Sequence, residues 1–214
     1  MERPLAHGGY NWADIDYPGA APAPSGPPRP SLQSGLVGGQ LGYNFQTSGL
    51  VIGGEVDFSF SGAESTERDG NYLTQSYEIE NLGSVRARLG YAMGSFLPFV
   101  TGGWAWADTT FNQTCPDGAQ FGHCRPAAAG PYNKTVSETV DGWVYGGGVE
   151  AAISKNWSLH AEYLRYEFDE QDYELGSSGN GTVLGAKTLE HEVDVVRVGV
   201  NYRFGEREAP APLK

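Results

Sequence analysis

The sequence lacks the features that mark helical membrane proteins and nucleic-acid-binding proteins. No apolar run approaches the roughly 18 residues that a membrane-spanning helix needs, and no stretch keeps a 3.6-residue apolar period. Basic residues are scarce, because 14 Lys and Arg stand against 26 Asp and Glu and give a formal net charge of −12. We therefore expect no nucleic-acid partner, since such partners are held by basic surfaces.

Cysteine is almost absent, and its two occurrences lie close together. Cys115 and Cys124 share one Gly/Pro-containing segment, "CPDGAQFGHC", with His123 beside them. A metal centre would need more Cys or His ligands, so we expect none. A close pair in a loop predicts a disulfide that forms in an oxidising compartment and pins the loop, with two free thiols as the alternative.

Histidine is also scarce, with four residues, and no catalytic set is evident. His160 falls on the polar face of a predicted strand among carboxylates, where a structural role is the simplest interpretation. His191 lies between two glutamates, but no nucleophile is arranged around it by spacing. We therefore expect a protein that is not an enzyme and binds no cofactor.

A secretory leader is missing from the printed sequence. The opening residues, "MERPLAHGGYNW", contain neither an apolar segment nor a small-residue cleavage site. We expect that the sequence begins after a removed or unrecorded leader.

Alternation with a period of two residues is abundant. Apolar and polar residues alternate in eight segments that are bounded by turn-forming residues and enriched in Gly, Tyr and Trp. The predicted strands are about 5–16, 35–46, 50–60, 83–93, 96–107, 142–153, 157–168 and 194–204.

The connections between these segments alternate between short and long. Three are hairpin turns of two or three residues, "TSG", "GS" and "SKN", and the other four, 17–34, 61–82, 108–141 and 169–193, are long. A membrane-spanning barrel strand needs only about 9–11 residues, so these segments are long enough to cross a bilayer as strands. Their alternation and the pattern of connections predict an all-β fold. We expect an eight-stranded antiparallel up-and-down transmembrane β-barrel with four long extracellular loops, three short periplasmic turns and periplasmic termini. It would span residues 1–204, with 205–214 as a short periplasmic tail.

The polar faces of the predicted strands carry both signs of charge. If they point into a narrow barrel, four arginines and four carboxylates could pair with one another. In a soluble barrel the same residues would form a solvated surface. The predicted lumen network consists of Glu55, Asp57, Arg86, Arg88, Glu150, His160, Glu162, Arg197 and Arg203.

Large aromatic residues gather near the two ends of the predicted strands rather than at their middles. This distribution is typical of the aromatic girdles that flank the lipid-facing band of outer-membrane barrels. The predicted girdle residues are Tyr10, Trp12, Phe45, Phe58, Phe60, Tyr91, Trp104, Trp106, Trp143, Trp157, Phe168, Tyr202 and Phe204.

Five segments resemble one known family in order and register. They are "GGQLGYNFQ", "VIGGEVDFSFSG", "LGSVRARLGYAMGSFLPFVTGGWAWA", "GWVYGGGVEAAISKNWSLHAEYLRYEF" and "VVRVGVNYRF". Together they resemble the small outer-membrane β-barrel (porin-like) family of alphaproteobacteria, which includes major surface antigens of Rhizobiales. The resemblance implies an eight-stranded, Gram-negative outer-membrane barrel, and it does not imply a catalytic activity. Such barrels usually end on the aromatic residue that the barrel-assembly machinery reads, whereas here "GEREAPAPLK" follows Phe204.

Three functions stay open at this point. The first is a structural barrel that supports the envelope, anchors surface loops and contacts membrane lipid and lipopolysaccharide. The second is an adhesion or ligand-binding module that acts through the third long loop, with a homo-oligomer also open. The third is a narrow channel for ions or small solutes, although an eight-stranded barrel is just wide enough to be filled by its own side chains.

Overall fold

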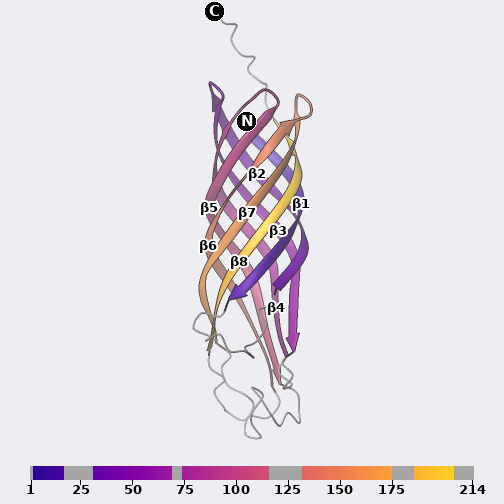
Figure 1. Ribbon diagram of the computed structural model, residues 1–214, viewed down its shortest axis with the longest axis vertical. Coiled ribbons are helices and arrows are strands. Elements are labelled where there is room, and N and C mark those ends of the chain that lie inside the picture. Colours follow the sequence, from indigo (N-terminus) through magenta and orange to yellow (C-terminus); the bar gives the residue numbers. More distant parts are fainter. Residues whose placement is uncertain (1, 17–30, 69–73, 116–131, 175–185, 205–214) are drawn as a thin grey trace, which may run out of the picture.

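The computed structural model describes residues 2–16, 31–68, 74–115, 132–174 and 186–204 (Figure 1). Within these ranges the chain forms strands and turns, and no helix there is long and apolar enough to cross a membrane. The strands are β1 (Glu2–Asp16), β2 (Ser31–Thr47), β3 (Leu50–Arg68), β4 (Thr74–Tyr91), β5 (Phe96–Cys115), β6 (Tyr132–Ala152), β7 (Trp157–Glu174) and β8 (Ala186–Tyr202).

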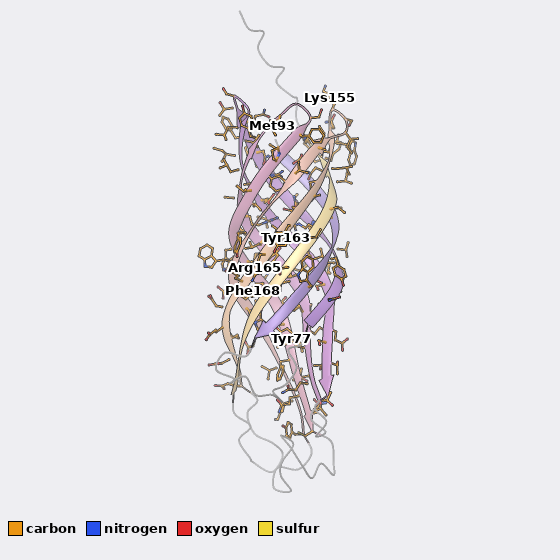
Figure 2. All side chains as sticks on the ribbon, in the orientation of Figure 1. Tyr77, Met93, Lys155, Tyr163, Arg165 and Phe168 are labelled. Atoms are coloured by element: carbon orange, nitrogen blue, oxygen red, sulfur yellow. The ribbon has the colours of Figure 1, made fainter. Side chains whose placement is uncertain are left out.

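The eight strands form one closed ring. Each strand pairs antiparallel with the next, and β1 closes the ring against β8 from Leu5↔Asn201 to Asp16↔Glu190. The three short turns lie at one end, which is the upper end of Figure 2, where Met93 and Lys155 are labelled. The first turn places Ser48 and Gly49 at positive φ, 46° and 92°, as tight hairpins with right-handed strand twist require. The predicted eight-stranded antiparallel barrel is confirmed.

The predicted strand lengths are wrong at the opposite end, which we call the long-strand end. Much of the predicted loops 61–82 and 108–141 is strand, and β3 to β6 are 18 to 21 residues long. Alternation is interrupted there by register shifts at Phe60/Ala63, Ile79/Asn81 and Phe168/Gln171. A bulge inserts an extra residue, so a period-two pattern read from sequence stops although the strand continues.

The two faces of the sheet exchange polarity along the strands. Near the short turns, apolar side chains such as Val198 and Leu159 point outward and are 60% and 49% exposed. Further along β7 the outward positions become Arg165 and Glu167, while the inward positions become Leu164 and Tyr166, both buried. Where the outer face is apolar, the barrel is suited to contact lipid. Where the outer face is polar and the interior is apolar, the barrel is suited to contact water. This change therefore marks the edge of the lipid-facing band. We call it the polarity inversion.

Candidate functional site in the barrel interior

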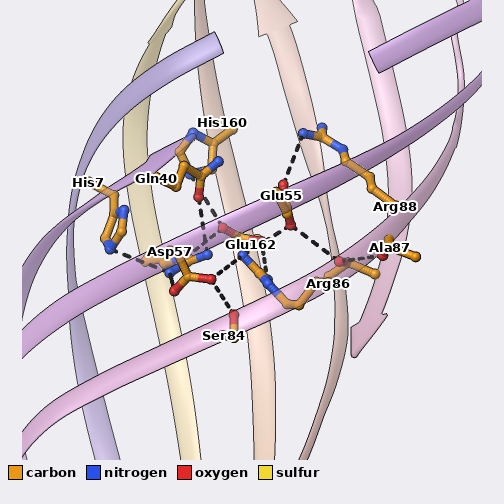
Figure 3. A network of polar contacts seen from close by, with 12 residues as sticks. His7, Gln40, Glu55, Asp57, Ser84, Arg86, Ala87, Arg88, His160 and Glu162 are labelled. Carbon is orange, nitrogen blue, oxygen red and sulfur yellow. Dashed lines mark hydrogen bonds and ion pairs between the residues drawn. The ribbon is translucent and has the colours of Figure 1, made fainter. Parts of the chain in front are cut away.

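Every strand contributes an inward polar side chain to a buried network between the short turns and the polarity inversion. Figure 3 shows part of this network, with labelled residues from β1, β2, β3, β4 and β7. Alternation along each strand brings them to one face, because successive residues of a strand point to opposite sides. We call this set the charged layer. Its principal members are His7, Gln40, Glu55, Asp57, Arg86, Arg88, Thr101, Glu150, His160, Glu162 and Arg197.

Arg86 of β4 lies at the centre of the charged layer. Its guanidinium contacts Glu55 of the neighbouring strand at 3.0 Å, Asp57 at 3.1 Å and, across the barrel, Glu162 of β7 at 3.3 Å. Ser84 donates a further hydrogen bond to Asp57. One buried cation therefore ties three strands together.

Arg197 of β8 forms the second centre. It donates to Asp57 at 2.9 Å and to Glu162 at 2.5 Å, so both carboxylates are shared with Arg86. It also donates to Gln40 at 3.2 Å, which connects β2 to the network. The carboxylates bridge the two arginines and reduce the repulsion between the two guanidinium groups.

A second group lies closer to the short turns. Arg88 donates to Glu150 at 2.9 Å and stacks over the Phe99 ring at 3.5 Å. Arg203 reaches the same carboxylate at 3.2 Å, and Ser158 donates to it at 2.7 Å. Glu150 is 0% exposed, so all of its compensation comes from the protein.

Together with Arg203, which lies closer to the short turns, the charged layer balances its formal charge. The four arginines are Arg86, Arg88, Arg197 and Arg203, and the four carboxylates are Glu55, Asp57, Glu150 and Glu162. All nine predicted lumen residues lie on the interior side, and His160 approaches Glu162 at 3.5 Å. Pairing of this kind offsets the high cost of taking ions out of water. Among the described residues, no group of three or more His, Cys, Asp or Glu side chains is placed to hold a metal ion.

A second, apolar layer fills the interior beyond the polarity inversion, and sequence reasoning missed it. Leu164 and Tyr166 of β7 are 0% and 2% exposed, and Val193 and Val195 of β8 are 0% and 1% exposed. The full apolar layer is Ala13, Leu36, Ala63, Tyr77, Ile79, Leu82, Ala105, Ala107, Phe111, Val140, Val144, Leu164, Tyr166, Phe168, Val193 and Val195. The signal was present in β7 and β8, where the apolar parity changes at Leu164 and Val195.

Phe168 corrects the predicted girdle. It points inward, is 4% exposed and stacks on Tyr166 with ring centroids 6.0 Å apart. The prediction treated every aromatic near a strand end as lipid-facing, whereas the polarity inversion turns apolar residues inward at this level. His191, which the sequence places between two glutamates, is also buried, and it stacks on Tyr77 with ring centroids 5.0 Å apart.

The other predicted girdle residues lie on the outer face or at its rim. Trp104 and Trp143 are register partners across β5 and β6 and are 46% and 67% exposed. Trp106 lies across Gly83, where a Cβ would come within 2.3 Å of the indole. The remaining exposed members are Tyr10, Phe45, Phe58, Phe60, Tyr91, Trp157 and Phe204, with Trp12 and Tyr202 partly covered. Their role at lipid interfaces stays a prediction.

The predicted disulfide is not tested by the described residues. Cys115 is the last residue of β5 and is 3% exposed. Cys124 lies outside the described residues, as do most of the third long loop and the tail 205–214. The pairing therefore stays a prediction.

Comparisons with known proteins agree with this geometry. The model of the outer membrane protein beta-barrel domain matches residues 2–204. The 31 kDa outer-membrane immunogenic protein of Brucella melitensis is 34% identical over 79% of this chain and 67% of its own length. The 22 kDa outer membrane protein of Rhizobium leguminosarum bv. viciae is 29% identical over 78% of this chain and 66% of its own.

Among solved structures, the outer membrane protein OprG from Pseudomonas aeruginosa is similar, with a TM-score of 0.49 and 12% identity over 94% of this chain and 95% of that one. The chain spans about two thirds of the length of the Brucella and Rhizobium relatives. With the family model matched over the whole described barrel, the chain belongs to the outer membrane protein beta-barrel domain family and is a protein of the Gram-negative cell outer membrane.

Proposed function

We propose that this protein is a sealed structural barrel that supports the outer membrane and anchors surface segments, and that it is neither an enzyme nor a channel. The observation that carries the proposal is the interior, which is filled by the charged layer and then by the apolar layer. An ion would have to cross both: the charged layer holds its charges in fixed pairs, and the apolar layer consists mainly of apolar side chains. Two different barriers in series favour a closed barrel.

We further propose that the short turns face the periplasm and the long-strand end faces the cell exterior. Outer-membrane barrels usually place short turns on the periplasmic side. The aromatic series Trp157, Tyr202 and Phe204, with successive ring centroids 5.0 and 4.8 Å apart, would then lie at the periplasmic rim. In this orientation the barrel-assembly machinery would meet Phe204, and lipopolysaccharide would surround the outer face near Trp104 and Trp143.

Planar-bilayer recording tests the sealed barrel directly. The wild-type protein and Arg86→Ala/Arg88→Ala should both stay closed, because the apolar layer remains. Adding Tyr166→Ala and Phe168→Ala should produce openings only in the fourfold variant. Conductance in the wild type, or in the arginine variant alone, would favour the narrow channel instead.

The envelope role needs a cellular test. A strain without the protein should become more sensitive to detergent and to large antibiotics. The wild-type chain and a chain lacking residues 116–131 should both restore resistance, since the proposal assigns this role to the barrel. If the shortened chain restores nothing although it reaches the outer membrane, the third long loop carries the function.

A further inference from the structure

Among the described residues, β6 has a strand partner on only one side along its first ten residues. β6 pairs with β5 as far as Cys115↔Tyr132, but its pairing with β7 stops at Gly142↔Phe168. Within the part of the chain that the structure describes, residues 132–141 therefore form a sheet edge of ten residues. We call these residues the β6 edge.

The break in pairing has a local cause in β7. Directly beyond the last paired residue, Phe168, the β7–β8 register shifts before Gln171. A bulge bends its strand and increases its twist, so β7 turns away from β6 at this point. At the last pair the backbones still approach so closely that a Cβ on Gly142 would lie 2.1 Å from the carbonyl oxygen of Glu167. The two strands are therefore still closely packed at the last pair, and the β6 edge begins at the next residue of β6.

The β6 edge is open on both of its faces. Ser137, Glu138 and Thr139 are three consecutive exposed residues, although alternation points them to opposite sides of the sheet. On the adjacent β5, Thr109 and Phe111 are each 2% exposed. This difference is expected at a sheet edge, because in the described part of the chain β5 has a paired strand on either side at this level and β6 has one.

An open edge presents backbone N–H and C=O groups that can pair with another extended chain. Closer to the short turns, β6 pairs with β7, and that pairing is antiparallel. An added strand that takes the place of β7 would therefore also run antiparallel. Lys134 and Glu138 share one face of the edge, four residues apart, so each would oppose one residue of the added strand.

We propose that the β6 edge binds an extended peptide by antiparallel strand addition and reads the order of its charges. Glu138 would oppose a basic residue of the peptide, and Lys134 an acidic residue four positions later. On the other face, Asn133, Thr135 and Ser137 would oppose residues with hydroxyl or amide groups. This binding function goes beyond the structural role proposed above and does not depend on it, because a sealed barrel could lack the activity and a leaky one could keep it.

Another edge of the same sheet is a natural comparison. β3 pairs with β2 only as far as Leu36↔Ser61, which leaves 63–68 paired with β4 alone among the described residues. This edge is shorter, and its first part alternates between buried Ala63 and exposed Glu64. It lacks three consecutive exposed residues in its described side chains, so it serves as the control surface.

The experiment uses the full chain in lipid nanodiscs and three labelled peptides. The probe is YNKTVSETVD, the sequence of residues 132–141, which carries the basic-to-acidic order itself. The second peptide, YNETVSKTVD, reverses the two charges, and the third replaces the central valine with proline. The probe should bind, the reversed peptide should bind roughly tenfold more weakly because both cross-strand charge pairs become repulsive, and the proline peptide should not bind.

Charge reversal in the protein completes the test. Lys134→Glu/Glu138→Lys should exchange the preference and bind the reversed peptide best, whereas Glu64→Lys on the control edge should change nothing. Heat-modifiable migration on a gel verifies that each variant is folded. No binding, equal binding of the three peptides, or an unchanged preference in the reversed protein would overturn the proposal. A dimer that forms without peptide and is lost on charge reversal would assign the edge to a second copy instead.

Discussion

At the scale of single residues, the value of an ion pair in this protein depends on where it lies. Arg86 and Arg165 each contact three carboxylates, with shortest distances of 3.0 and 2.5 Å. The Arg86 side chain is 0% exposed inside the barrel, whereas that of Arg165 is 31% exposed on the outer face. Removing one partner of a buried pair leaves uncompensated charge, while solvent screens a surface pair.

We therefore expect Arg86→Ala to lower the free energy of unfolding by about 3–5 kcal/mol, because Glu55, Asp57 and Glu162 lose a shared cation. The matched control, Arg165→Ala, should cost about 1 kcal/mol or less. Urea unfolding in detergent micelles, followed by tryptophan fluorescence, measures both. Equal losses in the two variants would mean that the burial of Arg86 contributes nothing.

At the scale of elements, the sequence predicted which segments form strands better than where the strands end. The stretch 196–204 alternates cleanly, and its apolar residues Val196, Val198 and Val200 are exposed on the outer face. The extensions of β3 and β4 were not predictable by alternation alone, because the register shifts at Phe60/Ala63 and Ile79/Asn81 break the period. The position of a bulge depends on how neighbouring strands pair, and the sequence of one segment does not contain that information.

The candidate site divides in the same way. The charged layer was predictable, because four arginines and four carboxylates fall on the polar parity of their strands. The individual ion pairs were not predictable, because they depend on ring closure. Arg86 and Glu162, for example, meet across the barrel. The apolar layer was missed because one polarity rule was applied along whole strands.

Phe168 provides the test of the apolar layer. Phe168→Ala should cost about 3–5 kcal/mol of unfolding free energy, as expected for a large side chain removed from a packed core. Trp143→Ala, which truncates an aromatic residue that is 67% exposed on the outer face, should cost clearly less in the same detergent. Thermal unfolding followed by circular dichroism compares them. A larger loss of unfolding free energy for Trp143→Ala than for Phe168→Ala would contradict the packing of Phe168 in the apolar layer.

At the scale of the whole molecule, the barrel combines a part suited to lipid with a part suited to water. The outer face carries Val198 and Val200 in the first part and Glu192 and Asp194 in the second, on the same strand. One sheet runs through both, so the long-strand end needs no separate domain to stand above the membrane. This arrangement predicts a defined orientation.

Labelling of intact cells checks that orientation. Ser137→Cys on β6 should react with a membrane-impermeant maleimide, because the long-strand end is proposed to face the exterior. Lys155→Cys, in a short turn, should react only after the outer membrane is opened. The parent chain supplies the background from its own cysteines. Labelling of Lys155→Cys in intact cells would reverse the proposed orientation.

The polarity inversion also fixes how deeply the barrel can sit. Sliding the molecule into the bilayer would carry Arg165 and Asp194 toward hydrocarbon, and sliding it out would bring Val196 and Tyr163 into water. Both displacements cost free energy, which for a charged side chain on the lipid face grows with depth. The barrel therefore has one preferred immersion level, and in a bilayer of unsuitable thickness the lipid has to stretch or thin around it.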